Sequence, residues 1–162
     1  MMRRALLALL LWCFTAPGLA ASNTLAPLTA ADIPALVKPP AHGERIIALW
    51  ALDCAYCEPN LAALAKLQRA HPHEIELVTV ATDDIASQRT AVENRLKAMH
   101  MTGYPARAYA AAAPERLNYL VDHDWGGETP RTLVIRSDGS RIAISGELTP
   151  QQLRRIIGQQ HW

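Results

Sequence analysis

The chain has 162 residues, half of which are hydrophobic, and its formal net charge at pH 7 is +1. This length and apolar content are enough for one domain with a substantial core. The balanced charge provides neither a basic excess for nucleic acid nor an acidic tail. With only 6% aromatic residues, the core must be built from aliphatic residues and alanine.

Residues 1–20 have the layout of a secretory signal peptide. A short positive region at residues 1–4 precedes an apolar run at residues 5–14, and residues 17–21 place small residues three and one positions before a cut after Ala20. The apolar run is shorter than the about 20 residues that span a bilayer. A cleaved signal peptide is therefore expected, and the alternative is an uncleaved segment that anchors the protein to the membrane.

Cleavage changes the charge and the cysteine count. Loss of Arg3 and Arg4 reduces 16 basic residues to 14 against 15 acidic ones, a net charge of −1, and loss of Cys13 reduces three cysteines to two. Trp12 precedes Cys13 where a lipoprotein site has a small residue, so lipidation is not expected. Export implies an oxidising compartment. The two remaining cysteines enclose so short a loop that a purely structural disulfide would add little stability.

An N-terminal arm is predicted over residues 21–44. It is rich in alanine and proline, which indicates a loop or a loosely packed segment. Asp32 and Pro34 suit the first turn of a short helix after Thr29.

The predicted domain over residues 45–162 begins with a strand at residues 45–50. This continuous apolar run suits a strand buried on both faces. Cys54 and Cys57 follow at once, and a helix and a second strand at residues 74–81 come next. The buried face of that helix is marked by leucines at helical spacing, namely Leu61, Leu64 and Leu67.

A second helix follows, for which Asp83 or Asp84 can serve as the N-cap. Its apolar face comprises Ile85, Val92, Leu96 and Met99. Residues 102–124 are broken by glycine and prolines, and we assign them to a helical insertion. A third strand is predicted at residues 132–136.

The C-terminal part has the clearest local signals. Residues 137–140 (Ser-Asp-Gly-Ser) form a hairpin turn, because glycine accepts a positive φ, and residues 141–145 form the antiparallel return strand. Thr149 caps the last helix, Pro150 takes its first position, and Gln152 completes a capping box.

This order of elements predicts an α/β fold. Parallel strand–helix–strand crossovers build the core of a mixed sheet, the hairpin adds antiparallel strands, and helices flank the sheet.

Cys54 and Cys57 form a C-x-x-C motif where a buried strand passes into a helix. A helix N-terminus carries unpaired N–H groups and a partial positive charge, which stabilise a thiolate and lower the cysteine pKa. The thiolate is the form that attacks disulfides. Two intervening residues let Cys57 reach back and resolve a mixed disulfide on Cys54. The position of the C-x-x-C motif in a βαβ pattern therefore indicates a redox-active cysteine pair.

The C-x-x-C motif has two alternative interpretations: it could be half of a zinc site, or it could form a disulfide with no redox role. Zinc needs about four ligands, and the chain has no second C-x-x-C, only His71 and His73 at a helix end. We therefore predict no metal site and no cofactor beyond a redox-active disulfide between Cys54 and Cys57.

A second signal is the dipeptide Thr129–Pro130 before the third predicted strand. Proline cannot donate to the hydrogen-bond ladder, so it is unusual at the mouth of an inner strand. A cis Thr129–Pro130 bond in a tight turn accounts for it, and an ordinary trans proline at a strand start is the alternative.

Together these features resemble the thioredoxin superfamily, most nearly its exported TlpA/ResA-like group, over most of the mature chain apart from residues 102–124. The resemblance implies a thioredoxin-like fold in which Cys54 attacks and Cys57 resolves. It also implies that a loop with cis Pro130 faces the pair and holds the substrate strand. Thr129 would contact the disulfide and the substrate backbone.

The chain departs from this family at three positions. Asp53 replaces the tryptophan before the first cysteine, Ala48 stands where thioredoxin has a buried aspartate, and Asn60 stands where the ResA-like group has a glutamate. The usual proton acceptor for the buried thiol is therefore missing. Glu58 or a water could replace it, although the more ordinary role of Glu58 is that of an acid in the first turn of a helix.

Asp53, Tyr56 and Glu58 are the candidate residues for tuning the pair. Tyrosine at the position of Tyr56 is found in related glutaredoxins, whose potentials of about −200 to −230 mV are less reducing than the about −270 mV of thioredoxin. The carboxylate of Asp53 disfavours a thiolate on neighbouring Cys54. This effect of Asp53 opposes that of Tyr56.

The resulting prediction is a periplasmic thiol–disulfide oxidoreductase of the protein-disulfide reductase type. Its expected partners are exported cysteine-containing proteins, including apocytochromes in cytochrome c maturation, and a membrane thiol donor. Contact with the membrane requires the uncleaved N-terminal segment. One alternative is a Cu(I) chaperone of related fold in which His123 joins the two thiolates. The other is a redox-inactive binding module with Trp125 and Tyr104 as contact residues.

Overall fold

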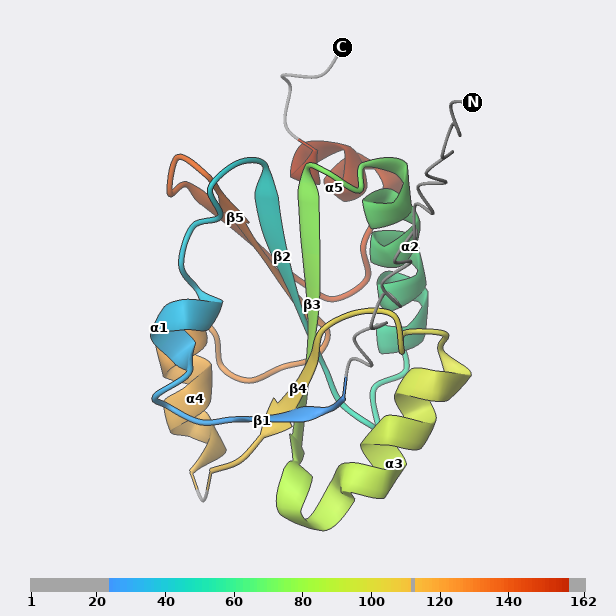
Figure 1. Ribbon diagram of the computed structural model, residues 1–162, viewed down its shortest axis with the longest axis vertical. Coiled ribbons are helices and arrows are strands. Elements are labelled where there is room, and N and C mark those ends of the chain that lie inside the picture. The colour runs from blue at the N-terminus through green and yellow to red at the C-terminus, as the bar shows by residue number, and fades with distance from the viewer. Residues whose placement is uncertain (1–23, 112, 158–162) are drawn as a thin grey trace, which may run out of the picture.

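The computed structural model describes residues 24–111 and 113–157, so the predicted signal peptide at residues 1–20 lies outside the described residues. A six-stranded sheet with the order β1-β4-β3-β2-β5-β6 lies between two layers of helices (Figure 1). The strands are β1 (Ala26–Leu28), β2 (Glu44–Trp50), β3 (Ile75–Asp84), β4 (Ala106–Tyr109), β5 (Arg131–Arg136) and β6 (Arg141–Ser145). The helices are α1 (Ile33–Leu36), α2 (Cys57–Ala70), α3 (Ile85–Ala98), α4 (Pro114–Val121) and α5 (Pro150–Ile156).

The sheet is mixed, as the sequence predicts. β1, β4, β3 and β2 run parallel to one another, β5 pairs antiparallel with β2, and β6 pairs antiparallel with β5. Every residue from Ile46 to Trp50 is buried, which fits a central strand covered on both faces. Because β2 and β3 are parallel, their carboxyl ends meet at one edge of the sheet, and the cysteine motif follows β2 there.

Two apolar cores fill the space on either side of the sheet. One core contains residues of α2, α3 and α5, with Leu61, Leu64 and Val92 fully or almost fully buried. The other contains residues of α1 and α4, with Leu117 and Val121 buried against β2 and β5. Figure 1 shows the two layers on opposite sides of the strands.

The prediction of a loosely packed arm over residues 21–44 is wrong for residues 24–44, the part of it that the structure describes, although the short helix expected after Thr29 is present as α1. β1 pairs with β4, and Leu28, Ile33 and Leu36 are buried in the α1–α4 core. These residues therefore belong to the domain predicted to start at residue 45. Composition misled the prediction here because the short apolar segments gain their stability from partners far away in the chain.

The assignment of residues 102–124 to a helical insertion needs a similar correction. This segment includes strand β4, which pairs with both β1 and β3, before helix α4. The strand has only four residues, too few for a recognisable alternation of buried and exposed positions.

The signals that depend on near neighbours in the chain are confirmed. Gly139 takes a φ of 85° in the hairpin turn, and the side chains of Thr149 and Gln152 form the predicted capping box of α5. Asp84, not Asp83, is the N-cap of α3, because its carboxylate accepts the N–H of Ser87.

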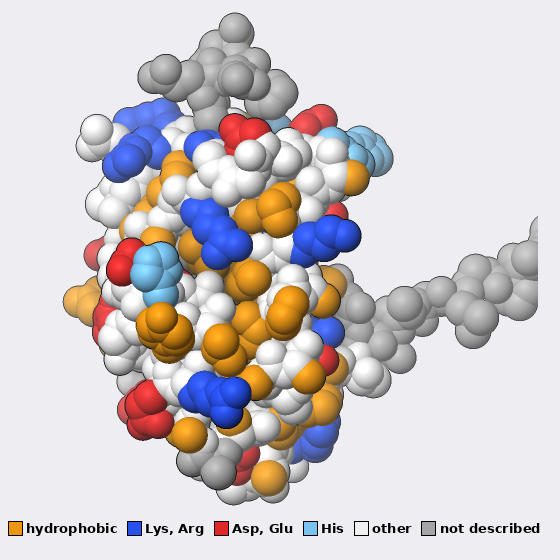
Figure 2. All heavy atoms as spheres, turned by 90° about the vertical axis from the view of Figure 1, so that its left-hand side faces the viewer, with side chains coloured by type: hydrophobic (Ala, Val, Ile, Leu, Met, Phe, Trp, Pro, Cys, Tyr) orange, Lys and Arg blue, Asp and Glu red, His pale blue; other side chains and the backbone are white. Residues whose placement is uncertain are grey.

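Figure 2 shows the side of the molecule that α1 and α4 cover, where hydrophobic side chains alternate with Lys and Arg. Tyr119 and Leu120 of α4 are exposed large apolar residues of the described part of the chain. Within residues 24–111 and 113–157, no helix has the length and apolar character needed to cross a membrane.

Candidate active site

The two cysteines lie between the end of β2 and the start of α2, and a disulfide joins them. Cys57 is the first residue of α2 and is only 2% exposed. Cys54 lies in the preceding turn and is half-buried, with its N–H donating to the carbonyl of Ala51. A thiol arriving from solvent can therefore reach Cys54 more readily than Cys57.

The start of α2 favours negative charge near the sulfurs. The N-cap, Tyr56, offers no side-chain acceptor to the N–H groups of the first turn. These groups and the helix dipole stabilise a thiolate at this end. The helix itself begins at Cys57, so Cys54 lies just outside the first turn rather than within it.

We expect alkylation of the reduced protein at mildly acidic pH to label Cys54 before Cys57. The first thiol is more accessible, and its thiolate is the form stabilised at the helix start. Mass spectrometry of digested protein after a short iodoacetamide pulse measures the two sites separately. Faster modification of Cys57 would reverse the assigned roles.

The loop before β5 lies beside the end of β2. The Thr129–Pro130 peptide bond is cis, the geometry that the sequence predicts. Arg131 pairs with Leu49, so Pro130 lies level with the residues that lead into the cysteine motif. Pro130 is buried and Thr129 is half-buried. Their contact with a substrate stays a prediction.

A polar network holds this loop, and the sequence did not reveal it. The indole N–H of Trp125 donates to the carbonyl of Glu128 at 2.8 Å. Arg131 donates to the carboxylate of Asp122 at 2.6 Å, and both side chains are nearly buried. Ser145 donates to the Glu128 carboxylate, and this bond is the largest cause that lowers the pKa of Glu128.

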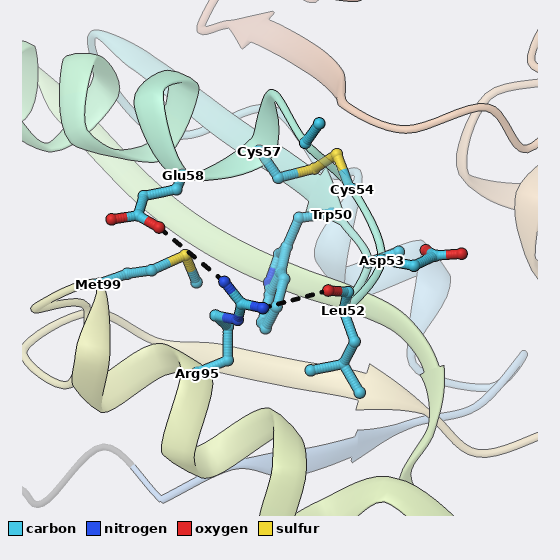
Figure 3. Close-up of a pocket in the computed structure, with 10 residues that line it drawn as sticks. Trp50, Leu52, Asp53, Cys54, Cys57, Glu58, Arg95 and Met99 are labelled. Carbon is cyan, nitrogen blue, oxygen red and sulfur yellow. Dashed lines mark hydrogen bonds and ion pairs between the residues drawn. A yellow bond between two sulfur atoms is a disulfide. The ribbon is translucent and has the colours of Figure 1, made fainter.

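The candidate tuning residues are all on the surface. Figure 3 shows the Asp53 carboxylate pointing away from Arg95, on the other side of the loop. The side chain of Tyr56 is also exposed. Glu58 is 62% exposed and lies 3.9 Å from Arg95, so it does not form a buried proton acceptor beneath Cys57.

The positions where the family resemblance implies carboxylates hold other groups. Ala48 is part of the apolar core. Asn60 is 4% exposed, its amide donates to the carbonyl of Gly146, and its oxygen accepts the N–H of Leu148, both at 2.9 Å. Asn60 therefore ties the first turn of α2 to the segment between β6 and α5.

Asp83 is the acidic residue that the structure adds to the site. Its carboxylate accepts the N–H of Leu52 at 3.0 Å, two residues before Cys54. Partial burial raises the pKa of Asp83, which outweighs the opposing effect of the Leu52 hydrogen bond. The sequence showed only that Asp83 could be a helix cap, because Leu52 lies 31 positions away.

We expect the free energy of unfolding of Asp83→Asn to increase, relative to that of the wild type, as the pH rises from about 4 to 7. Below the unfolded-state pKa, the carboxyl is protonated in both states and carries no penalty. As the pH rises through the raised folded-state pKa, the folded protein loses stability relative to the unfolded chain. Asparagine removes this titration and can still accept the N–H of Leu52.

Urea unfolding of the oxidised protein at several pH values measures this difference. Asp84→Asn is the matched control, because hydrogen bonds from Ser87 lower the pKa of Asp84. Its free energy of unfolding relative to the wild type should fall as the pH rises. A difference for Asp83→Asn that is independent of pH would contradict the prediction.

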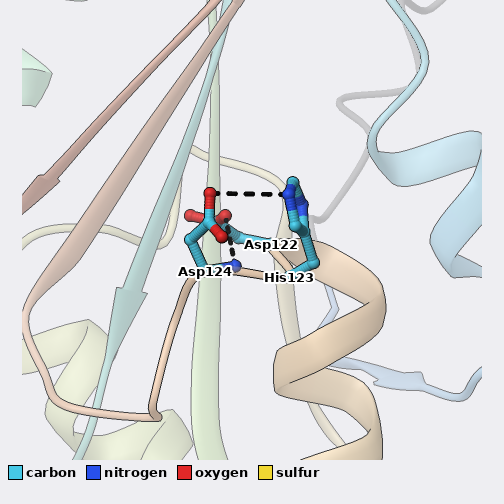
Figure 4. A group of neighbouring side chains, drawn as sticks. All are labelled: Asp122, His123 and Asp124. Carbon is cyan, nitrogen blue, oxygen red and sulfur yellow. Dashed lines mark hydrogen bonds and ion pairs between the residues drawn. The ribbon is translucent and has the colours of Figure 1, made fainter.

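The residues proposed for the alternative functions do not come together as those functions require. Asp122, His123 and Asp124 are close enough to share a cation (Figure 4), but Asp122 already pairs with Arg131. This group, found among the described residues, contains neither cysteine. The contact residues of a redox-inactive module are packed instead: Trp125 is 4% exposed, and the hydroxyl of Tyr104 bonds to the carbonyl of Ala65.

Comparisons with known proteins agree with the architecture. No family model and no curated protein sequence matches the chain. The solved structure of a thioredoxin-related protein from Neisseria meningitidis serogroup B is 26% identical, with a TM-score of 0.56 over 72% of this chain and 83% of that chain. A thiol:disulfide interchange protein from Chlorobium tepidum is 21% identical, with a TM-score of 0.56 over 85% and 95%.

A secreted disulfide oxidoreductase of Mycobacterium tuberculosis is 14% identical, with a TM-score of 0.54 over 71% of this chain and 80% of that chain. The fold is therefore thioredoxin-like, and its structural neighbours include a disulfide oxidoreductase and a thiol:disulfide interchange protein. The more specific resemblance to the TlpA/ResA-like group stays a prediction.

Proposed function

We propose that the protein is a periplasmic thiol–disulfide oxidoreductase that exchanges disulfides with exported cysteine-containing proteins. The observation that carries this proposal is the pairing of a half-buried Cys54 with a buried Cys57 by a disulfide at the start of α2. A disulfide that closes so short a loop adds little to stability, whereas this placement suits exchange.

In the reducing direction, the Cys54 thiolate attacks a substrate disulfide. One substrate sulfur leaves as a thiolate, and the other stays bonded to Cys54. The Cys57 thiol then loses its proton and attacks the Cys54 sulfur, which releases the second substrate thiolate and restores the Cys54–Cys57 disulfide. Two electrons pass to the substrate, and a membrane thiol donor would restore the dithiol.

Thr129 and Pro130 are proposed to hold the substrate strand beside this reaction, since their loop lies level with the end of β2. Export is supported by the signal-peptide layout of residues 1–20. The structural similarity to a secreted disulfide oxidoreductase of M. tuberculosis agrees with that location. Apocytochromes are the substrates suggested by the sequence resemblance.

The test is an equilibrium of the mature protein with glutathione or dithiothreitol, with the dithiol fraction measured by mass shift on alkylation. We expect a single two-electron transition between about −120 and −270 mV, the range of exchange proteins. A potential below about −300 mV, typical of structural disulfides, would overturn the proposal.

A further inference from the structure

A pocket lies beside the disulfide, between the β2–α2 loop and α3 (Figure 3). The cysteines form one side of it, and Arg95 of α3 and Met99, the C-cap of that helix, form the other. Trp50 lines the same pocket, and Figure 3 shows its indole between the disulfide and the Arg95 guanidinium. Cys54 and Arg95 therefore line one pocket from opposite sides.

Among the described residues, the guanidinium of Arg95 makes only long contacts with other groups. Its guanidinium donates to the carbonyl of Leu52 at 3.4 Å and lies 3.9 Å from the carboxylate of Glu58. A charge-assisted bond from arginine to a carboxylate is normally about 2.7–2.9 Å. Both side chains of the ion pair are about half exposed, so a ligand carboxylate can replace Glu58 at little cost.

Trp50 supplies a second, independent sign of a ligand. The residue is 1% exposed, and its indole Nε1–H is buried with no hydrogen-bond partner among the described residues. Buried donors are nearly always paired, because an unpaired one has lost its hydrogen bonds to water without replacement. Asp53 and Glu58 also line the pocket, but the Asp53 carboxylate points away from Arg95. Trp50 and Arg95 offer donors and no acceptor, so the group that suits the part of the pocket beside Arg95 is an acceptor with negative charge.

We propose that this pocket binds a carboxylate carried by the substrate close to its reacting sulfur, and that Arg95 is the residue that determines this specificity. The inference rests on the proposed exchange at Cys54. The carboxylate can belong to a small thiol acid or to an acidic side chain beside a cysteine of a peptide. Glu58 competes with it for Arg95.

The reaction that tests the pocket is reduction of the Cys54–Cys57 disulfide by small thiols. The thiolate attacks the Cys54 sulfur, the bond to Cys57 breaks, and Cys57 leaves as a thiolate that takes up a proton. A second thiolate then attacks the mixed disulfide and releases Cys54. Two thiols are oxidised to one disulfide, and the protein disulfide is reduced to two thiols.

The experiment compares 3-mercaptopropionate, which carries a carboxylate, with neutral 2-mercaptoethanol. The ratio of their second-order rate constants is measured for each variant, so that the intrinsic reactivity of each thiol cancels. We expect Arg95→Gln to lower the ratio about tenfold, as loss of a charge-assisted contact predicts. Glu58→Gln should raise the ratio, and Trp50→Phe should lower it about threefold.

Lys97→Gln is the matched control, because it removes one positive charge from the same helix without touching the pocket. Its ratio should stay within about twofold of the wild type. A second arm of the experiment uses two reduced peptides, each with one cysteine, that differ only in having Glu or Gln beside it. The ratio of their rate constants is compared in the same way. An effect of Arg95→Gln in either arm supports the pocket and identifies the carboxylate source.

Equal ratios for the wild type and Arg95→Gln in both arms would overturn the pocket while leaving exchange at Cys54 intact. Failure of every thiol to reduce the disulfide would instead overturn the proposed function. A change of the same size in Lys97→Gln would show general electrostatic attraction and would also overturn the pocket.

Discussion

Cys57→Ser is expected to accumulate mixed disulfides with its partners, and Cys54→Ser is not. Exchange passes through a covalent adduct on the attacking sulfur. In the wild type, Cys57 resolves that adduct quickly, because the helix holds its thiol beside Cys54 at a high effective concentration. Without Cys57, the adduct persists until an outside thiol arrives.

The unequal burial of the two cysteines makes the expected difference in trapping between the two variants large. Cys57 is 2% exposed at the first position of α2, so a partner cysteine cannot approach it in Cys54→Ser. The exported Cys57→Ser variant should show higher-mass species on non-reducing gels that disappear with reductant. Mass spectrometry of these species would identify the partners.

The control is the double variant with both cysteines replaced by serine, which should trap nothing. Trapping by Cys54→Ser at a level similar to Cys57→Ser would show that the order of attack is wrong. An absence of adducts in every variant would exclude exchange with exported proteins under those conditions.

Asn60→Ala is expected to lower the free energy of unfolding by about 2–3 kcal/mol. The substitution removes the bonds to Gly146 and Leu148 and leaves the N–H of Leu148 buried without its acceptor. Alanine favours a helix over asparagine by about 0.5 kcal/mol, which offsets only a small part of this loss.

Urea unfolding of the oxidised protein measures the change. Lys66→Ala is the matched control on α2, because Lys66 is exposed and its replacement should change stability by less than about 0.5 kcal/mol. A similarly small effect of Asn60→Ala would mean that Asn60 does not tie α2 to the segment between β6 and α5.

Local chemistry explains which parts of the fold could be predicted. The capping box at Thr149 and the glycine turn at Gly139 use contacts within three or four residues, so their signals are complete in a short window. The apolar run of β2 and the following C-x-x-C motif are equally compact. These signals correctly indicated a mixed α/β sheet with the cysteine pair at a strand–helix junction.

The strands β1 and β4 at one edge of the sheet could not be predicted from such local signals. Ala26 of β1 pairs with Arg107 of β4, and neither short strand has an alternation that distinguishes it from a loop. A strand of three or four residues is stable only when its partner is in place. Proline and alanine in both segments pointed instead to an arm and a helical insertion.

The sequence by itself determined the nature of the reactive pair: two cysteines spaced for exchange, after a buried strand and at the start of a helix. Tertiary structure alone decided what surrounds them. Asp83 reaches Leu52 across 31 positions, and Arg95 reaches the same residue across 43. These residues meet only because the parallel strands β2 and β3 end at the same edge of the sheet, where α2 and α3 begin.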